Sequence, residues 1–276
     1  MASRVPHPVP YQGSKRLLAA AILAHAPPKV STLYEPFAGS LALSLAAAAG
    51  ERAEHFVVGD SLAPLAELWG AVVNRPDEIA AAYETLWRQV GLPDPYFAIR
   101  EAFNTDREPA KLLYLLARCV KGAVRFNASG GFNQAPDRRR RGVTPDRMRR
   151  HIEGASRLLA GRAAVLSADF EMTVASAGPA DLVYLDPPWQ GTTTGKDRRY
   201  ATGLPRERLL AALGTLQARR VPFLLSYDGK TGDRTYGEPL PASLGLRHLE
   251  LDGGRSTQAT LLGRSARTIE SLYAWP

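Results

Sequence analysis

Asp186-Pro187-Pro188-Trp189 combines a carboxylate, two rigid turn residues and an aromatic ring directly after the apolar run 182–185, which we expect to be a buried strand. Each proline fixes its own φ and pushes the residue before it towards extended backbone, so the pair holds the neighbouring carbonyls in set directions. An exocyclic amine on an aromatic base offers two N–H donors, and it needs two acceptors and a stacking surface. These four residues can supply both acceptors and the surface. The alternative is that they form only a turn, as we expect for the Pro-Asp-Pro sequence at 93–95.

A turn that contains glycine, Glu35-Pro36-Phe37-Ala38-Gly39-Ser40, follows the first expected strand and precedes a helix. A ligand can approach the backbone closely at such a glycine, although the dinucleotide fingerprint G-x-G-x-x-G is absent. Asp60 follows Gly39 by 21 residues, at the end of the next strand, where folds of this kind hold a ribose with a carboxylate. The structural alternative for Asp60 is a helix N-cap.

Two shorter segments carry further side chains suited to ligand binding. Tyr11-Gln12-Gly13-Ser14-Lys15 offers an aromatic ring, a glycine that permits close approach and a cation before a helix. Asp169-Phe170 offers a carboxylate and a ring that can stack on adenine, just after a strand expected at 164–167. The alternatives are a surface turn for the first segment and a loop with a core phenylalanine for the second.

The elements that must position these groups alternate between strand and helix. Strands are expected at 33–37, 56–58, 164–167, 182–185, 223–226 and 269–275, and helices at 15–24 (capped by Ser14), 41–49 and 206–219. This order predicts an α/β fold of the Rossmann type. We assign residues 1–65 and 163–276 to this domain.

Residues 66–162 are predicted to form a helical and basic insertion. Apolar residues recur at helical spacing in 79–90 and 110–119, and Thr144-Pro145 matches an N-cap followed by proline at the first helical position. The chain has a net charge of +8, and residues 118–150 carry ten lysines and arginines against two aspartates. The whole excess of positive charge therefore lies in the insertion.

A basic patch of this density is what contacts with nucleic-acid phosphates require. Phe126, Asn127, Phe132, Asn133 and Gln134 are interleaved with the cations and suit contacts with bases. We therefore favour a nucleic-acid interface over the alternative, a solvated charged loop.

The rest of the composition is that of a globular protein. The single cysteine, Cys119, rules out an intrachain disulfide and fits a reducing compartment. The five histidines show no ligand spacing, so no zinc site is expected. No apolar run approaches the ~20 residues of a membrane span, and we expect no signal peptide.

Taken in order, the motifs resemble those of the Dam-like DNA adenine N6-methyltransferases, the D12 class with the α motif order. The aromatic-x-Gly-x-Lys, Glu-Pro-Phe-x-Gly and acidic elements of that family match Tyr11–Lys15, Glu35–Gly39 and Asp60. Its two insertion motifs match 96–104 and 125–133, and its Asp-Pro-Pro-aromatic motif matches 186–189. The resemblance covers nearly the whole chain.

The resemblance implies a class I methyltransferase sheet that uses S-adenosylmethionine and no metal, with residues 66–162 as a DNA-recognition domain. The catalytic residues would be Asp186, Pro187, Pro188 and Trp189. The cofactor pocket would be lined by Tyr11, Gly13, Lys15, Glu35, Phe37, Gly39, Ser40, Asp60, Asp169, Phe170 and Asp186. The DNA contacts would come from Lys121, Arg125, Asn127, Asn133, Arg138, Arg139, Arg140 and Arg141, with Arg125 matching an arginine that reads guanine.

The expected activity is methylation of the exocyclic N6 of an adenine flipped out of double-stranded DNA. The alternatives are N4-cytosine methylation of DNA, N6-adenine methylation of RNA, or a non-catalytic DNA-binding protein on the same scaffold. Val120-Lys121 stands where the best-known members intercalate and contact bases, so we do not expect GATC as the target. Two positions differ from the usual family residues: Tyr11 stands in place of a tryptophan, and Trp189 in place of a tyrosine. Tyr200 is expected either in the adenine pocket or on the surface.

The same resemblance implies a protein of the prokaryotic cytoplasm, associated with the nucleoid. We expect a monomer to act on the DNA. No endonuclease signature is visible in the sequence, so a restriction partner would be a separate chain.

Overall fold

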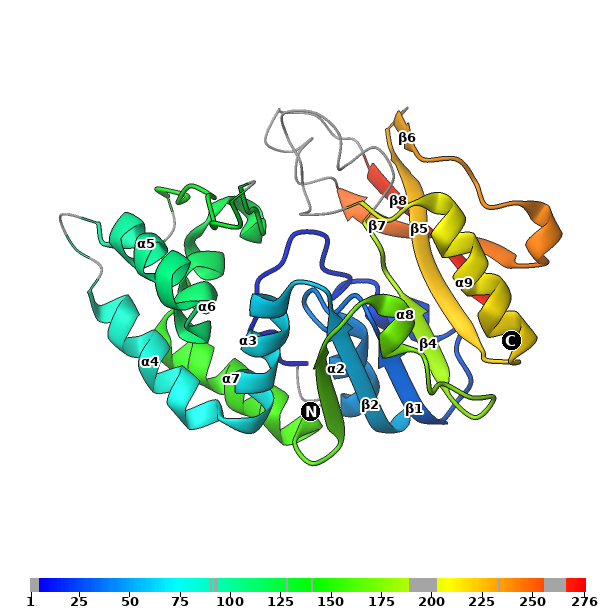
Figure 1. Ribbon diagram of the computed structural model, residues 1–276, viewed down its shortest axis with the longest axis horizontal. Coiled ribbons are helices and arrows are strands. Elements are labelled where there is room, and N and C mark those ends of the chain that lie inside the picture. Colours follow the sequence, from blue (N-terminus) through cyan, green and yellow to red (C-terminus); the bar gives the residue numbers. More distant parts are fainter. Residues whose placement is uncertain are drawn as a thin grey trace.

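A sheet with helices on both faces forms one half of the protein, and a helical lobe lies beside it (Figure 1). The computed structural model describes residues 5–89, 91, 94–127, 129–139, 141–188, 203–232, 234–255 and 267–276. The strands are β1 Val30–Glu35, β2 Ala53–Asp60, β3 Ala163–Ser167, β4 Leu182–Leu185, β5 Phe223–Thr231, β6 Arg234–Tyr236, β7 Arg247–Arg255 and β8 Arg267–Trp275. They are ordered β3-β2-β1-β4-β5-β8-β7, with β6 paired to β5.

The first five strands of this order run parallel, whereas β8 and β7 are antiparallel to their neighbours. The order reverses between β1 and β4, and ligands of open α/β sheets bind in the crevice at the carboxyl ends of the strands beside such a reversal. The predicted Rossmann-like fold is confirmed, and the reversal puts Glu35 and Asp186 at adjacent strand ends.

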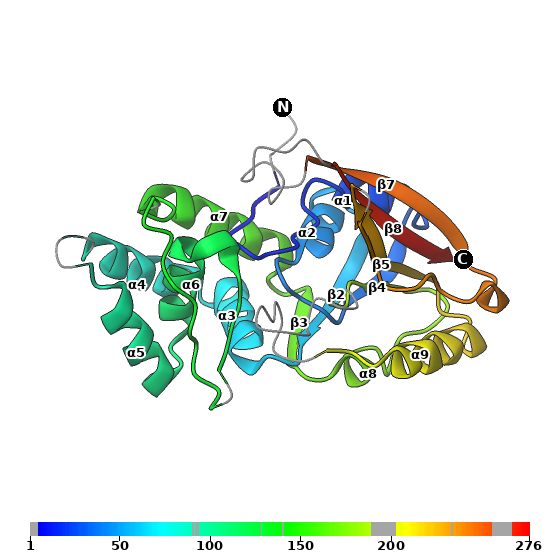
Figure 2. The same cartoon turned by 90° about the horizontal axis from the view of Figure 1, so that it is seen from above.

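Helices bury both faces of the parallel strands (Figure 2). One face is covered by α1 Ala19–Leu23, α2 Ala42–Ala49 and α3 Ala63–Asn74, and the other by α8 Phe170–Thr173 and α9 Arg206–Ala218. Helices cover both faces of β4, and all four of its residues are buried. A strand in this position has to be apolar along its whole length. This is why 182–185 could be recognised as a strand from sequence.

The helical lobe consists of α4 Pro76–Arg88, α5 Tyr96–Asp106, α6 Pro109–Arg118, the 3₁₀ turn η1 Val120–Gly122 and α7 Pro145–Leu159. Buried aromatic residues fill it, among them Tyr83, Phe103 and Tyr114. α3 packs against β3 and also against α6 and α7, so the boundary that we expected at residue 66 falls inside α3. A second 3₁₀ turn, η2, spans Ala242–Leu244.

Several predicted elements are confirmed, and a helix lies within the range 15–24 that we expected, but its predicted start and its predicted cap are wrong. The helices expected at 41–49 and 206–219 are α2 and α9, Thr144-Pro145 begins α7, and the tail forms β8. However, α1 begins only at Ala19, and Ser14 does not cap it. The hydroxyl of Ser14 instead accepts a hydrogen bond from Ser40 Oγ at 2.7 Å, since tight turns at 11–18 direct this segment into the site. β1 also lies earlier than expected, at Val30–Glu35 rather than 33–37, and β7 was not predicted.

Candidate active site

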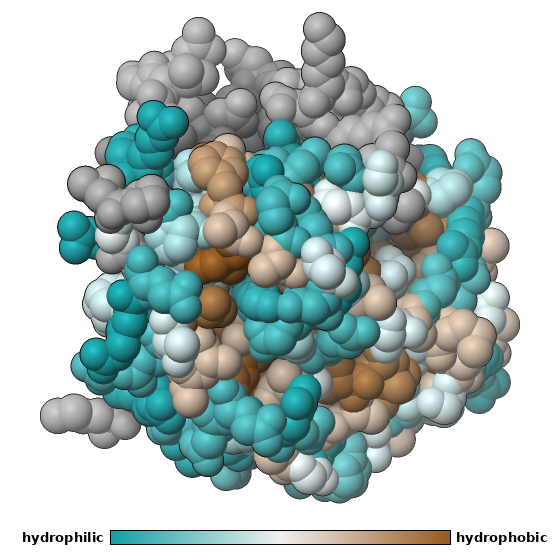
Figure 3. Space-filling model, turned by 60° about the vertical axis from the view of Figure 1, so that its left-hand side comes forward, coloured by the Kyte–Doolittle hydropathy of each residue, from teal (hydrophilic) through white to brown (hydrophobic). Residues whose placement is uncertain are grey.

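A cleft of about 1750 Å³ opens at the carboxyl ends of the parallel strands, between the sheet and the helical lobe. Every residue predicted to hold the cofactor lines this cleft, as do Pro187 and Pro188. Viewed with the helical lobe forward, the surface is mostly hydrophilic, with apolar groups lying in hollows between the polar ones (Figure 3). The tertiary structure thus brings together predicted site residues that are 175 positions apart in sequence, Tyr11 and Asp186, and adds Glu270 from near the end of the chain.

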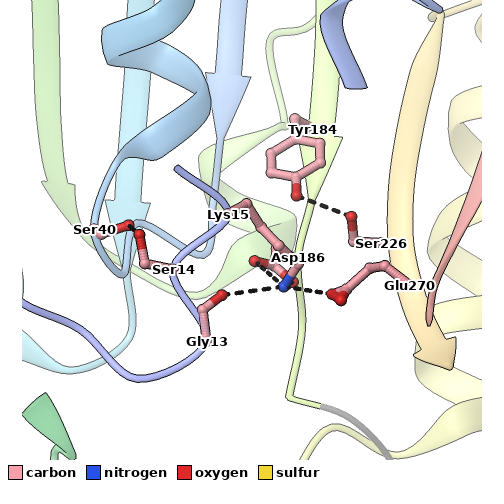
Figure 4. Close-up of polar contacts among 8 residues, drawn as sticks. All are labelled: Gly13, Ser14, Lys15, Ser40, Tyr184, Asp186, Ser226 and Glu270. Carbon is pink, nitrogen blue, oxygen red and sulfur yellow. Dashed lines mark hydrogen bonds and ion pairs between the residues drawn. The ribbon is translucent and has the colours of Figure 1, made fainter. Parts of the chain in front are cut away.

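The ammonium of Lys15 joins two carboxylates in the floor of the cleft (Figure 4). Its Nζ lies 2.8 and 2.9 Å from the two oxygens of Asp186 and 2.8 Å from Oε1 of Glu270. The side chains of Lys15 and Glu270 are 9% and 7% exposed, whereas that of Asp186 is 21% exposed. Asp186 is therefore the member of this cluster that a substrate in the cleft can reach.

Burial raises the pKa of Asp186 to about 6; the ammonium of Lys15 opposes this shift and the charge of Glu270 adds to it. Burial lowers the pKa of Lys15, but the charges of Asp186 and Glu270 outweigh it, and the net pKa lies well above the usual value. The ammonium is therefore retained at neutral pH. Beneath the cluster, the hydroxyls of Tyr184 and Ser226 are 2.9 Å apart and tie β4 to β5.

Gly39 and Asp60 form a second, smaller arrangement on the β1–β2 side of the cleft. Gly39 has a φ of +44°, and a Cβ there would lie 3.3 Å from the ring of Tyr11. The carboxylate of Asp60 accepts hydrogen bonds from the amides of Leu62, at 2.9 Å, and Gly39, at 3.5 Å. Burial raises the pKa of Asp60 to about 6. The capping alternative for Asp60 is wrong, because Leu62 is the N-cap of α3 and no side chain caps that helix; Asp60 lines the cleft instead.

Two aromatic rings stack beside this arrangement. The ring centroids of Phe37 and Phe170 are 5.4 Å apart. Asp169 caps α8 by accepting a hydrogen bond from the amide of Glu171. The guanidinium of Arg208, on α9, lies over the ring of Phe170 and forms an ion pair with Asp169 at 2.6 Å. Phe170 is 3% exposed and packs in the core, as the alternative for this residue expected, so the partly buried ring of Phe37 is the aromatic surface of this pair that a flat ligand can contact.

Glu35 lines the cleft, but its carboxylate is turned to the first turn of α2. It accepts hydrogen bonds from both the amide and the hydroxyl of Ser44. Burial raises the pKa of Glu35 to about 7. The carboxylate of Glu35 thus has a hydrogen-bond partner, Ser44, that the sequence motif did not predict.

Among the predicted DNA-contacting residues, Arg125, Asn127 and Asn133 lie in a short hairpin of the helical lobe in which Phe126 and Phe132 pair. Asn127 holds its turn, because its Oδ1 accepts a hydrogen bond from the amide of Gly131 at 2.7 Å.

The arginines at 138–141, after this hairpin, differ in their contacts. Arg139 forms an ion pair with Asp137 at 3.0 Å, whereas Arg141 is exposed and lines the cleft. Arg138 is exposed. Lys121 lies in η1, and its side chain is not described; Arg140, Trp189 and Tyr200 lie outside the described residues.

Sequence reasoning missed Glu270 and Arg208. An acidic residue inside the apolar strand 267–275 is the one signal that could have drawn attention to Glu270, whereas nothing in the sequence singles out Arg208. In the part of the chain that the structure describes, no group of histidine, cysteine and acidic side chains is arranged to hold a metal ion. No helix there is both long and apolar enough to cross a membrane.

The amino-acid sequence is similar to those of several named DNA methyltransferases. The retron Ec67 DNA adenine methylase of Escherichia coli is 28% identical over 192 residues, which are 67% of this chain and 64% of that protein. The DNA adenine methylase of Salmonella typhi is 27% identical over 226 residues, 78% of each protein. The type II methyltransferase M1.LlaDCHI of Lactococcus lactis subsp. cremoris is 26% identical over 188 residues, 65% of this chain and 64% of that protein. The chain thus spans just under two thirds of the first and third of these relatives.

A family model described as D12 class N6 adenine-specific DNA methyltransferase matches residues 11–249, which include Tyr11–Lys15, Glu35–Gly39, Asp60 and Asp186–Trp189. Since the match extends over most of the chain, this protein belongs to the D12 class of N6 adenine-specific DNA methyltransferases.

Proposed function

We propose that this protein transfers a methyl group from S-adenosylmethionine to the exocyclic N6 of an adenine flipped out of double-stranded DNA. The observation that carries the proposal is the position of Asp186, a partly exposed carboxylate that follows β4 and lines the same cleft as Gly39 and Asp60. The cleft thus has an acceptor for an amine at one end and a ligand-binding turn at the other.

The residues of the cleft fit S-adenosylmethionine. Gly39 leaves its backbone open to close approach, since a side chain there would meet Tyr11. In this proposal Asp60 holds the ribose hydroxyls, and the adenine of the cofactor contacts the ring of Phe37, which the buried Phe170 supports, with Asp169 at its edge. When bound, the cofactor supplies a sulfonium methyl group that can be displaced without a covalent enzyme intermediate.

Asp186 and a backbone carbonyl near Pro187 accept the two hydrogens of the target amine. Two acceptors draw the nitrogen lone pair out of conjugation with the ring and direct it towards the methyl group. Positive charge grows on the nitrogen during transfer, so a fixed carboxylate stabilises the transition state more than the ground state. Trp189 stacks on the flipped base, a contact worth ~1–3 kcal/mol for an aromatic side chain.

Residues 66–162 act as the target-recognition domain. The amine of a paired adenine is inaccessible for in-line attack within the stack, so the base must leave the duplex. Arg125 reads a guanine, and the exposed Arg138 and Arg141 contact phosphates. The duplex then lies across the mouth of the cleft, with its flipped base directed at Asp186.

The biological setting follows from the same proposal. The protein acts on DNA in the cytoplasm of a prokaryotic cell, as a monomer. One relative is named a type II methyltransferase, which supports a role in restriction–modification with a separate endonuclease chain.

Incubation of duplex DNA with the protein and labelled S-adenosylmethionine, followed by digestion to nucleosides, tests the proposal. We expect label in N6-methyl-2′-deoxyadenosine from DNA. Label in N4-methyl-2′-deoxycytidine, or transfer to RNA alone, would replace the proposed substrate with one of the alternatives. Calorimetric titration with the cofactor separates an enzyme from a non-catalytic scaffold, which does not need to bind it.

A further inference from the structure

Glu270, in β8, brings a second carboxylate to the ammonium of Lys15. Its Oε1 lies 2.8 Å from Nζ of Lys15. The other oxygens around Nζ are the two of Asp186, at 2.8 and 2.9 Å, and the carbonyl of Gly13, at 3.2 Å. Four oxygens therefore surround an ammonium that has only three N–H donors.

The oxygen left without a donor belongs to Glu270. Within the described part of the protein, its Oε1 is buried and accepts no hydrogen bond, although it lies close to Nζ of Lys15. Buried polar atoms are nearly always hydrogen-bonded, so this exception calls for a reason. A small rotation of the ammonium about the Cε–Nζ bond would direct an N–H at Oε1 of Glu270 and take that donor from one oxygen of Asp186.

The backbone holds Glu270 firmly in this position. β8 lies between β5 and β7, and Glu270 pairs with Gly229 on one side and with Leu251 on the other. The carboxylate is thus carried by an inner strand of the sheet rather than by a loop. The partner that can reorient is the ammonium of Lys15, because its three N–H groups turn about the Cε–Nζ bond while Nζ stays between the two carboxylates.

We propose that Glu270 is a positioning residue, which accepts an N–H of Lys15 when the amine of the target base binds Asp186. The inference rests on the proposed function. An ammonium that donates to both oxygens of Asp186 occupies the acceptors that an amine becoming positive needs. An N–H turned to Glu270 frees one oxygen of Asp186, while Nζ stays between the two carboxylates and the buried ammonium remains paired.

The variant Glu270→Gln tests this exchange, with Glu250→Gln as the matched control. Glu250 lies on the neighbouring strand β7 and forms an exposed ion pair with Lys230, outside the cleft. In E270Q the ammonium stays on Asp186. We expect kcat to fall roughly tenfold, the effect of weakening one charge-assisted hydrogen bond in the transition state, with KM for DNA and Kd for the cofactor unchanged. Glu270→Asp, which keeps the charge, should recover part of the rate.

A pH profile distinguishes this role from a merely structural one. The titratable groups that interact with Asp186 are Lys15, Glu270, Tyr184 and Glu35. Because the charge of Glu270 raises the pKa of Asp186, E270Q should move the acid limb of kcat to lower pH. A variant that only loosens the fold would lower the melting temperature and leave that limb in place.

Carboxyl ¹³C NMR of the protein without DNA supplies a readout that needs no activity. The titration midpoint of Asp186 should move to lower pH in E270Q and stay in place in E250Q. An unmoved midpoint, or a kcat of E270Q equal to that of the wild type, would overturn the role of Glu270. Wild-type protein that methylates no adenine would instead refute the proposed function, and the NMR result would still decide whether Glu270 and Asp186 are coupled.

Discussion

The ring of Tyr11 lies against Gly39, so that a Cβ at position 39 would sit 3.3 Å from two of its carbons. The contact joins the N-terminal segment to the turn after β1 and shapes the cofactor side of the cleft. Gly39 also has a positive φ, which L side chains rarely adopt. Both the contact with Tyr11 and the positive φ therefore favour glycine at position 39.

Gly39→Ala should weaken binding of S-adenosylmethionine, because the methyl group displaces Tyr11 and strains the turn. We expect a loss of at least about 1 kcal/mol, that is, a several-fold rise in Kd measured by calorimetry. Gly70→Ala is the control, since a Cβ at Gly70 in α3 meets no atom within 4 Å. Equal affinities in the two variants would show that the turn is not part of the cofactor site.

Asp186→Ala should abolish methyl transfer and leave cofactor binding measurable. The change removes the acceptor for the target amine and frees Lys15, whose remaining carboxylate partner is Glu270. Single-turnover assays with labelled cofactor measure the rate, and calorimetry measures binding. A variant that retains activity would remove Asp186 from the reaction.

The stability of the protein should fall as pH rises through the pKa of Asp60. Burial raises that pKa to about 6 in the folded state, from 3.8. The folded protein therefore binds the proton more tightly than the unfolded chain, and this stabilisation is present below about pH 4 and lost as pH rises past 6.

Asp60→Asn should make the stability curve flatter. Thermal unfolding at pH 5 and pH 8 should show a gain on the order of 2 kcal/mol at the higher pH, since no charge is then buried. The same variant should lose affinity for the cofactor because the ribose loses its carboxylate. A pH dependence identical to that of the wild type would mean that Asp60 does not titrate as the structure indicates.

Arg125 and Arg141 should differ in how they contribute to DNA binding. Arg125→Ala should relax specificity at one base position by ~1–3 kcal/mol, whereas Arg141→Ala should weaken binding to all sequences and reduce the salt slope by about one. Arg139→Ala should change the slope less, because Asp137 already pairs with Arg139. Competition binding with single-base variants of the site, repeated over a salt series, measures both effects. A uniform loss in R125A would make Arg125 a phosphate contact.

The positions of the main motifs follow from sequence because buried parallel strands are apolar along their whole length. β4 has the bounds expected for it, so the position of Asp186 at a strand end was predictable. The start of the N-terminal helix was not predictable, since the turns at 11–18 that delay it to Ala19 depend on contacts with distant partners such as Ser40 and Asp186. Local helical propensity was overruled there by tertiary hydrogen bonds and an ion pair.

The amino-acid sequence alone predicts the parallel α/β order, the confinement of excess positive charge to residues 118–150 and the set of motifs that resemble the methyltransferase family. Two contacts become visible only in the folded protein: the ammonium of Lys15 lies between the carboxylates of Asp186 and Glu270, and the guanidinium of Arg208 lies over the ring of Phe170. The difference arises because hydrophobic periodicity reports burial along one element. Contacts between charged side chains depend instead on strand order and register, and the antiparallel β8 enters the sheet beside β5 from the far end of the chain.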